Sequence, residues 1–114
     1  MAGSAHAQER WVRVTTTVDG ATVDIDRQTL RRSGASVTVW QRRTDPRADR
    51  EGTQVRLSQF EYDCANATSD LLAYVNQTLS GGVIHSGAVA PHERERRPIS
   101  PNSVAEGVWE AICR

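Results

Sequence analysis

Lysine is absent from this 114-residue sequence, so all fourteen basic side chains are arginines. Fourteen acidic side chains balance them, and the formal net charge is zero. A general binder of nucleic acid would carry a basic excess, so we expect no nucleic-acid partner. The exclusive use of arginine has two interpretations, a GC-rich genome or selection for bidentate contacts to carboxylates and phosphates.

Long apolar runs are missing as well. No window approaches the roughly 18 uninterrupted apolar residues that a membrane helix needs, so we expect no transmembrane segment. Apolar residues make up 38% of the chain, which is low for a globular protein and predicts a thin core. The length suits one domain and is too short for two independent cores.

Catalytic and cofactor motifs are equally scarce. The sequence contains no G-x-S-x-G nucleophile motif and no phosphate loop with its lysine. His85 and Ser86 would point to opposite faces of a strand, so they cannot form a dyad. Asp24 and Asp26 share one strand face, where we expect solvated carboxylates. We therefore predict a protein that is not an enzyme and that uses no cofactor and no metal.

Only two cysteines occur, Cys64 and Cys113, separated by 49 positions. A metal site would need clustered ligands, and a redox pair would be closer in sequence. A structural disulfide and two buried free thiols remain as interpretations. A bridge would close a loop of about 50 residues and stabilise the domain by roughly 4 kcal/mol.

The first seven residues are interpreted as processing remnants. Residues 1–4 look like a vector remnant, and Ala5-His6-Ala7 resembles the small-x-small end of a secretory signal peptide. The mature chain would then begin at Gln8, and residues 8–114 would form a single domain. We expect that domain to lie in the periplasm or at the cell surface, where disulfides persist.

Alternating apolar residues predict about five or six strands. We place them at residues 11–18, 22–26, 36–40, 55–64, 69–77 and 83–84, the last one extending to Val89. Asp19-Gly20 predicts a hairpin turn, residues 27–34 a helical turn or loop, and residues 42–52 an exposed hairpin loop. The apolar parity changes near Ser58-Gln59, which predicts a β-bulge or a strong bend. The 69–77 segment also fits a helix, although its residue types favour a strand.

The C-terminus carries the clearest helix signal. Ser103 and Glu106 form an S-x-x-E capping box, and Gly107 would let the helix approach the sheet closely. Cys113 follows on the flank of the apolar stripe. The stripe consists of Val104, Val108 and Ile112. Strands followed by a single helix predict an α+β fold, an antiparallel β-sheet of about five or six strands with a C-terminal α-helix packed on it.

Three segments resemble the surface-adhesin protein E family of Gram-negative bacteria: Asp63-Cys64-Ala65-Asn66, residues 100–113, and the pair of strands at 23–26 and 37–40. The similarity runs over most of residues 11–113. It implies an exported envelope protein whose terminal helix is tied to an antiparallel sheet by a Cys64–Cys113 disulfide. The best-known member is an adhesin that binds host extracellular proteins through basic, lysine-containing segments, whereas this chain has no lysine.

Two arginine-rich loops carry the residues that we expect to contact a partner. They are solvated loops or a patch for an anionic partner, and an aromatic side chain beside the first could stack on a guanidinium group or a ligand. The residues are Trp40, Arg42, Arg43, Arg47 and Arg50 at the first loop, and Arg94, Arg96 and Arg97 at the second.

From these residues and the resemblance we expect a non-enzymatic, exported cell-envelope protein that binds a protein or anionic glycan partner through surface loops. The alternative is a periplasmic inhibitor or regulator of a cell-wall or secreted enzyme, with an arginine loop placed in an acidic cleft. An exposed edge strand would also allow a homodimer.

Overall fold

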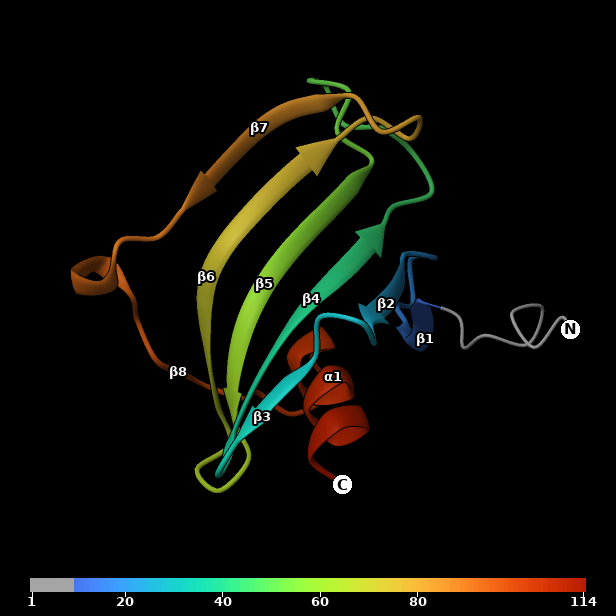
Figure 1. The fold of residues 1–114 in the computed structure, drawn as a ribbon. Helices are drawn as coiled ribbons and strands as arrows, with labels where there is room; N and C mark the ends of the chain where they lie inside the picture. Colours follow the sequence, from blue (N-terminus) through green and yellow to red (C-terminus); the bar gives the residue numbers. More distant parts are fainter. Residues whose placement is uncertain (1–9) are drawn as a thin grey trace, which may run out of the picture.

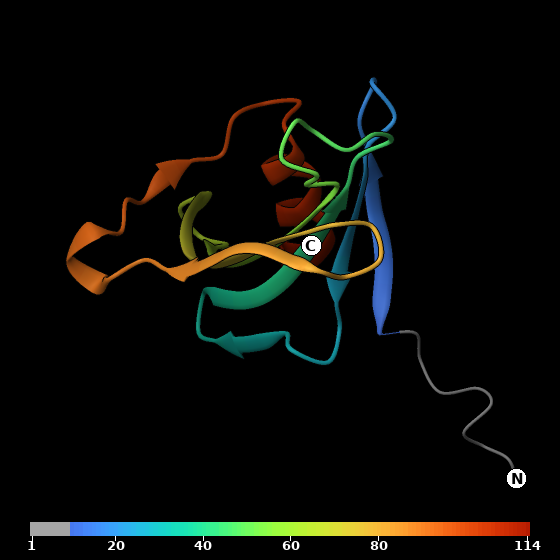
Figure 2. The ribbon, with the colours of Figure 1, turned by 90° about the horizontal axis from the view of Figure 1, so that it is seen from above.

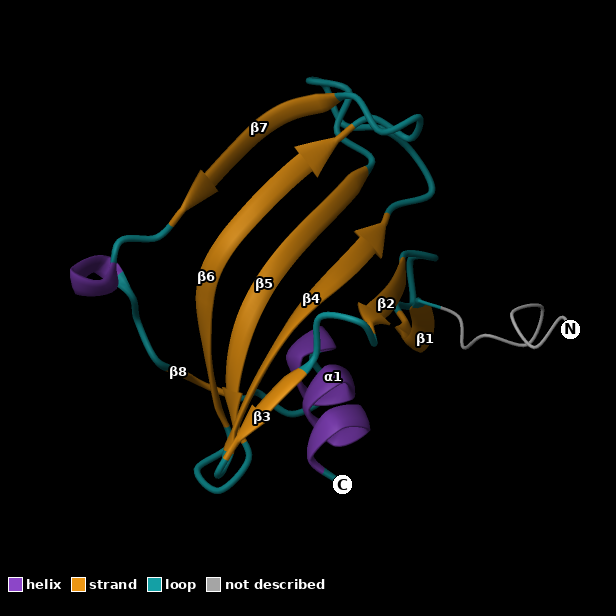
Figure 3. Ribbon diagram, in the orientation of Figure 1, coloured by secondary structure: helices purple, strands orange, loops and turns teal. Residues whose placement is uncertain are grey.

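The computed structural model describes residues 10–114, so the predicted remnants at residues 1–7 lie outside the described part of the chain. The strands form one antiparallel, eight-stranded sheet with the central order β1-β2-β4-β5-β6-β7 (Figures 1 and 3). The elements are β1 (Trp11–Thr16), β2 (Thr22–Asp26), β3 (Arg31–Ser33), β4 (Ser36–Thr44), β5 (Val55–Asp63), β6 (Thr68–Gln77), β7 (Val83–Ala88), the 3-10 helix η2 (Pro91–Glu93), β8 (Arg97–Pro98) and α1 (Val104–Cys113).

The sheet has more strands than the five or six that we predicted. The extra ones are β3, which pairs with β4, and β8, which pairs with β6. The helical turn or loop predicted for residues 27–34 is therefore wrong at residues 31–33, which form β3, while residues 27–30 are a turn and loop. β3 folds back onto β4 through Gly34, whose φ of +59° is a conformation that glycine adopts without strain.

Two predicted boundaries are also wrong. β1 ends at Thr16, so Val18 lies in the following turn and is fully exposed. β4 continues to Thr44, so Arg42 and Arg43 are strand residues and not part of an exposed loop. Both errors arise because alternating apolar residues indicate where a strand lies and do not indicate where it ends. The last residue of a strand depends on how far the neighbouring strand pairs with it.

Helix α1 packs against one face of the sheet, and the sheet bends around it (Figure 2). This helix-facing side carries the core, and Tyr62 is its largest buried side chain. The Tyr62 hydroxyl donates to Gln41 Oε1 at 2.6 Å, and burial raises the pKa of that hydroxyl. The core residues are Val23, Ile25, Val37, Val39, Tyr62, Val108 and Ile112.

A register irregularity lies where the parity change of β5 predicted a β-bulge, between Gln59 and Phe60, but only in the pairing of β5 with β6. The register between β4 and β5 is unbroken, so Leu57 and Phe60 lie on opposite faces of one regular strand. The register shift occurs in the pairing of β5 with β6, where β6 contributes Leu72 as the extra residue. Apolar residues of both parities therefore lie on both faces of β5, where Val55 is buried and Leu57 and Phe60 are half-buried.

The end of α1 is fixed to the end of β5. Cys64 and Cys113 form a disulfide with their Cα atoms 5.4 Å apart, so the bridge is confirmed and the free-thiol alternative is wrong. Beside it, Trp109 Nε1 donates to the Asp63 carbonyl at 3.2 Å. At the other end of α1, Ser103 accepts from the Glu106 amide as predicted, while Glu106 Oε1 accepts from the Asn102 amide.

Candidate binding surface

Three hairpin turns meet at one end of the sheet, because β1–β2, β4–β5 and β6–β7 all reverse direction there (Figure 1). We define the hairpin end as residues 17–21, 45–54 and 78–83. A Cβ on Gly20 would lie 3.8 Å from the ring of Pro46, and one on Gly52 would lie 3.7 Å from Ile84. The middle turn therefore lies against the first turn and against the start of β7, which directly follows the third turn.

Each turn of the hairpin end is ordered by one side-chain oxygen. Thr17 Oγ1 accepts from the Ala21 amide at 3.0 Å, and Thr78 Oγ1 accepts from the Gly82 amide at 2.9 Å. Asp49 Oδ1 accepts two backbone amides of the middle turn at 2.9 Å. Side chains that bond their own turn in this way fix its backbone, so the tips are preorganised.

Apolar side chains protrude from the hairpin end. Val18 is fully exposed, and Leu79 and Val83 are 63% and 62% exposed. Within residues 10–114, every large apolar side chain with this degree of exposure lies at the hairpin end. Single exposed apolar residues are ordinary, whereas several at one end of a molecule mark an interaction site.

Two unpaired arginines lie among these apolar tips. Arg47 and Arg50 are exposed and make no hydrogen bond or ion pair with any residue from 10 to 114. Arg43 differs, because its Nε lies 3.0 Å from Asp45, which also binds Arg56. The first predicted basic loop therefore provides two free guanidinium groups and is otherwise internally neutralised.

The hairpin end is not uniformly basic. Asp19 is exposed there and accepts a hydrogen bond from the Thr17 hydroxyl, and Arg43 lies 4.0 Å away. The Thr17 hydrogen bond first, then the backbone amide of Asp19 itself, and least of all the charge of Arg43 lower the pKa of the Asp19 carboxyl. A partner therefore meets separate positive and negative points on this surface.

The second predicted loop is bound to the rest of the protein. Arg96 lies 3.2 Å from Asp63 and 3.9 Å from Asp70 on the sheet, and Arg97 lies 3.1 Å from Glu95. Arg94 Nε donates to the Val89 carbonyl at 3.1 Å. Hydrogen bonds from Asn66 and the charge of Arg96 lower the pKa of Asp63. The structure thus separates this loop from Arg47 and Arg50, and its arginines are occupied.

Trp40 and Arg42 lie on the sheet face away from α1. Arg42 stacks over the Trp11 ring at 4.4 Å and binds Asp24 Oδ2 at 3.0 Å. Trp40 lines a shallow cavity of about 230 Å³ together with Trp11 and Asp26. These side chains belong to an ion-paired layer on the sheet face, and both are strand residues of β4 and not part of the loop that follows it.

The carboxylates of that layer are buried. Asp24 and Asp26 are only 4% and 1% exposed, so the predicted solvated face is wrong. Arginines on neighbouring strands cover both carboxylates: Arg13 binds Asp24, and Arg10 binds Asp26. Both aspartates are therefore engaged as structural ion-pair partners.

Comparison with known proteins identifies the family. A profile of surface-adhesin protein E matches residues 11–114. The chain belongs to the surface-adhesin protein E family. No curated protein sequence matches it. A crystal structure of Haemophilus influenzae protein E is similar with a TM-score of 0.68 at 11% identity, covering 94% of this chain and 89% of that one. A structure of protein E from non-typeable H. influenzae gives 0.60 at 11% identity, covering 94% and 77%.

For this surface-adhesin protein E domain, the sequence analysis missed the exposed apolar tips. A usable signal existed, since Val18 directly precedes Asp19-Gly20 and Leu79 directly precedes Ser80-Gly81. An apolar residue inside a tight turn cannot reach the core, because the turn projects away from the sheet. Such residues are exposed whatever strands flank them.

Residues 10–114 contain no group of three or more histidine, cysteine, aspartate or glutamate side chains placed to hold a metal ion. In that part of the chain, no helix has the length and apolar character required to cross a membrane.

Proposed function

We propose that this protein is an exported, non-enzymatic component of the cell envelope that binds a protein partner through the hairpin end. Membership of the surface-adhesin protein E family supports an adhesin-like role. The observation that carries the proposal is the joint placement of exposed apolar tips with two unpaired arginines on one preorganised surface.

The chemistry of this end favours a protein over an anionic glycan. Val18 and Leu79 offer apolar surface whose burial stabilises a complex. Arg47 and Arg50 are free to bind carboxylates bidentately without losing an existing partner. A sulfated glycan would need contiguous positive charge, and Asp19, Asp45 and Asp49 interrupt it. The expected partner surface is apolar with acidic side chains at its rim.

The test compares two variants of the full chain. Val18→Ser/Leu79→Ser/Arg47→Gln/Arg50→Gln removes the binding groups, and Arg94→Gln/Arg97→Gln is a control at exposed arginines elsewhere. Surface plasmon resonance against a panel of extracellular-matrix proteins should show at least tenfold weaker binding for the first variant, about 1.4 kcal/mol. The control variant should bind as the unaltered protein does.

Three outcomes contradict the proposal. One is equal loss in both variants. Another is binding to heparin that depends on Arg47 and Arg50 while Val18 and Leu79 have no effect, which would make the partner a glycan. A third is binding confined to hydrolases of the same envelope, which would favour the periplasmic regulator.

A further inference from the structure

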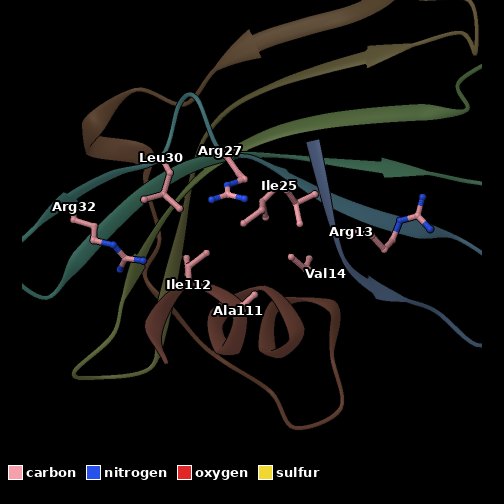
Figure 4. Close-up of a pocket in the computed structure, with 9 residues that line it drawn as sticks. Arg13, Val14, Ile25, Arg27, Leu30, Arg32, Ala111 and Ile112 are labelled. Carbon is pink, nitrogen blue, oxygen red and sulfur yellow. The ribbon is translucent and has the colours of Figure 1, made fainter. Parts of the chain in front are cut away.

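A groove opens beside α1 on the helix-facing side of the sheet (Figure 4). It lies between the β1–β2 edge of the sheet, the segment at residues 27–32 and the last turn of α1. Its volume is about 630 Å³, within the range of roughly 300–1,000 Å³ that holds small molecules. Apolar side chains make its floor: Val12, Val14, Ile25, Leu30, Ala111 and Ile112.

The groove exists because β1 is an edge strand and α1 is short. Gly107 brings α1 onto β1, and a Cβ at that position would lie 3.1 Å from Thr15 Cβ. Six residues further on, the helix ends at Cys113, and Leu30 stands opposite Ile112 across the opening (Figure 4). Beyond β1 no further strand of the described chain closes the side of the groove.

Two arginines border this apolar floor without a counter-ion. Arg27 and Arg32 line the groove, and neither makes a hydrogen bond or ion pair through its guanidinium group with residues 10–114. Arg13 also lines it, but its guanidinium points away (Figure 4) and binds Asp24 Oδ1 at 2.7 Å. No acidic residue from that range lines the groove, so a positive rim stands over an apolar floor.

We propose that this groove binds an anionic amphiphile with one acyl chain and a carboxylate or phosphate head. The head lies at Arg27 and Arg32, which are free to form charge-assisted hydrogen bonds. The acyl chain lies along the floor between Val14 and Ile112. A neutral lipid leaves both guanidinium groups without a partner, and a hydrophilic anion leaves the floor unused. The ligand must therefore combine both properties.

The test uses the full chain and titrates dodecanoate, tetradecanoate and hexadecanoate below their micellar concentrations, followed by intrinsic tryptophan fluorescence. Affinity should rise about fourfold per methylene that reaches the floor. Lysophosphatidylglycerol, which has one acyl chain and a phosphate head, is titrated in parallel. If it binds more tightly than hexadecanoate, the ligand is a lysophospholipid, and if it binds more weakly, the ligand is a fatty acid. Hexadecanol, which has the chain without the charge, should bind at least tenfold more weakly than hexadecanoate.

Variants separate this site from the hairpin end. Arg27→Gln/Arg32→Gln should weaken hexadecanoate binding at least tenfold, whereas the control Arg47→Gln/Arg50→Gln should leave it unchanged. Ala111→Trp, at an exposed helix position, should block the groove while keeping both charges. Circular dichroism melts verify that each variant is folded. Equal binding of hexadecanol and hexadecanoate overturns the proposal, and so does equal binding by the two arginine variants. The hairpin-end proposal is unaffected by either result.

Discussion

Asp24 is held between two guanidinium groups, with Arg13 Nε at 2.7 Å and Arg42 Nη2 at 3.0 Å. The carboxylate is 4% exposed, while the two arginine side chains keep 55% and 33% of their surface in water. The aspartate and the arginines therefore depend on these ion pairs to different degrees. The carboxylate needs the arginines, and the arginines can be solvated without it.

This asymmetry predicts unequal effects of substitution. Arg13→Met/Arg42→Met leaves a buried carboxylate without a counter-ion and should lower the free energy of unfolding by about 3–5 kcal/mol. Asp24→Asn should cost less, because both arginines then turn to water. Urea unfolding of both variants measures the difference. A larger loss for Asp24→Asn would contradict the role given to the arginines.

Sequence reasoning at the residue scale identified the arginines and could not assign their partners. Arg96 contacts Asp63, 33 residues earlier in the chain, and Arg42 contacts Asp24, 18 residues earlier. Such pairs form only after strands have taken their places in the sheet. Arg47 and Arg50 were predicted together with six other contact residues, and their distinguishing property, the lack of a partner, emerges only from the folded structure.

At the scale of elements, the predictable parts are those with a strong local signal. The Ser103 cap and the apolar stripe predicted α1, and alternation predicted β2 and β6. β3 is three exposed residues without an apolar side chain, and β8 is two residues including a proline. Their pairing with β4 and β6 is imposed by the tertiary fold, so no local pattern could predict them.

Gly107 illustrates how an element is adjusted to its neighbour. Alanine would favour the helix by up to about 1 kcal/mol, yet its Cβ would lie 3.1 Å from Thr15 Cβ. We expect Gly107→Ala to destabilise the protein, because the contact involves a Cβ fixed to the backbone of β1 and not the end of a flexible side chain.

A double-mutant cycle checks this prediction. Thr15→Gly removes the contacting atoms, so Gly107→Ala should cost less stability in that background than in the unaltered protein. Thermal melts of the four proteins give the coupling. Additive effects would contradict the proposed close approach of α1 to β1.

For the whole molecule, the disulfide is the main constraint beyond the thin core. Cys113→Ser should lower the free energy of unfolding by roughly 4 kcal/mol, from the chain entropy of a loop of about 50 residues. In a domain of this size the melting temperature should fall by more than about 10 °C. Calorimetry with and without reductant measures it, and an unchanged melt under reductant would contradict the prediction.

The overall architecture could be predicted because few arrangements satisfy strands followed by one helix and two distant cysteines. The meeting of three hairpin turns at one end follows from strand order and register, which alternation does not determine. Val18 lies far in the sequence from Leu79 and Val83, and the three gather at one end only once β1, β4 and β6 have taken the same direction.

The Cys64–Cys113 bond also makes a closed covalent ring of the intervening chain, which contains β6, β7 and β8. Residues 91–98 are the longest exposed stretch of that ring. A protease that cuts there once opens the ring and releases no fragment, since both new ends stay attached through sulfur. Outside the cytoplasm, such a molecule survives a single nick without shedding its terminal helix.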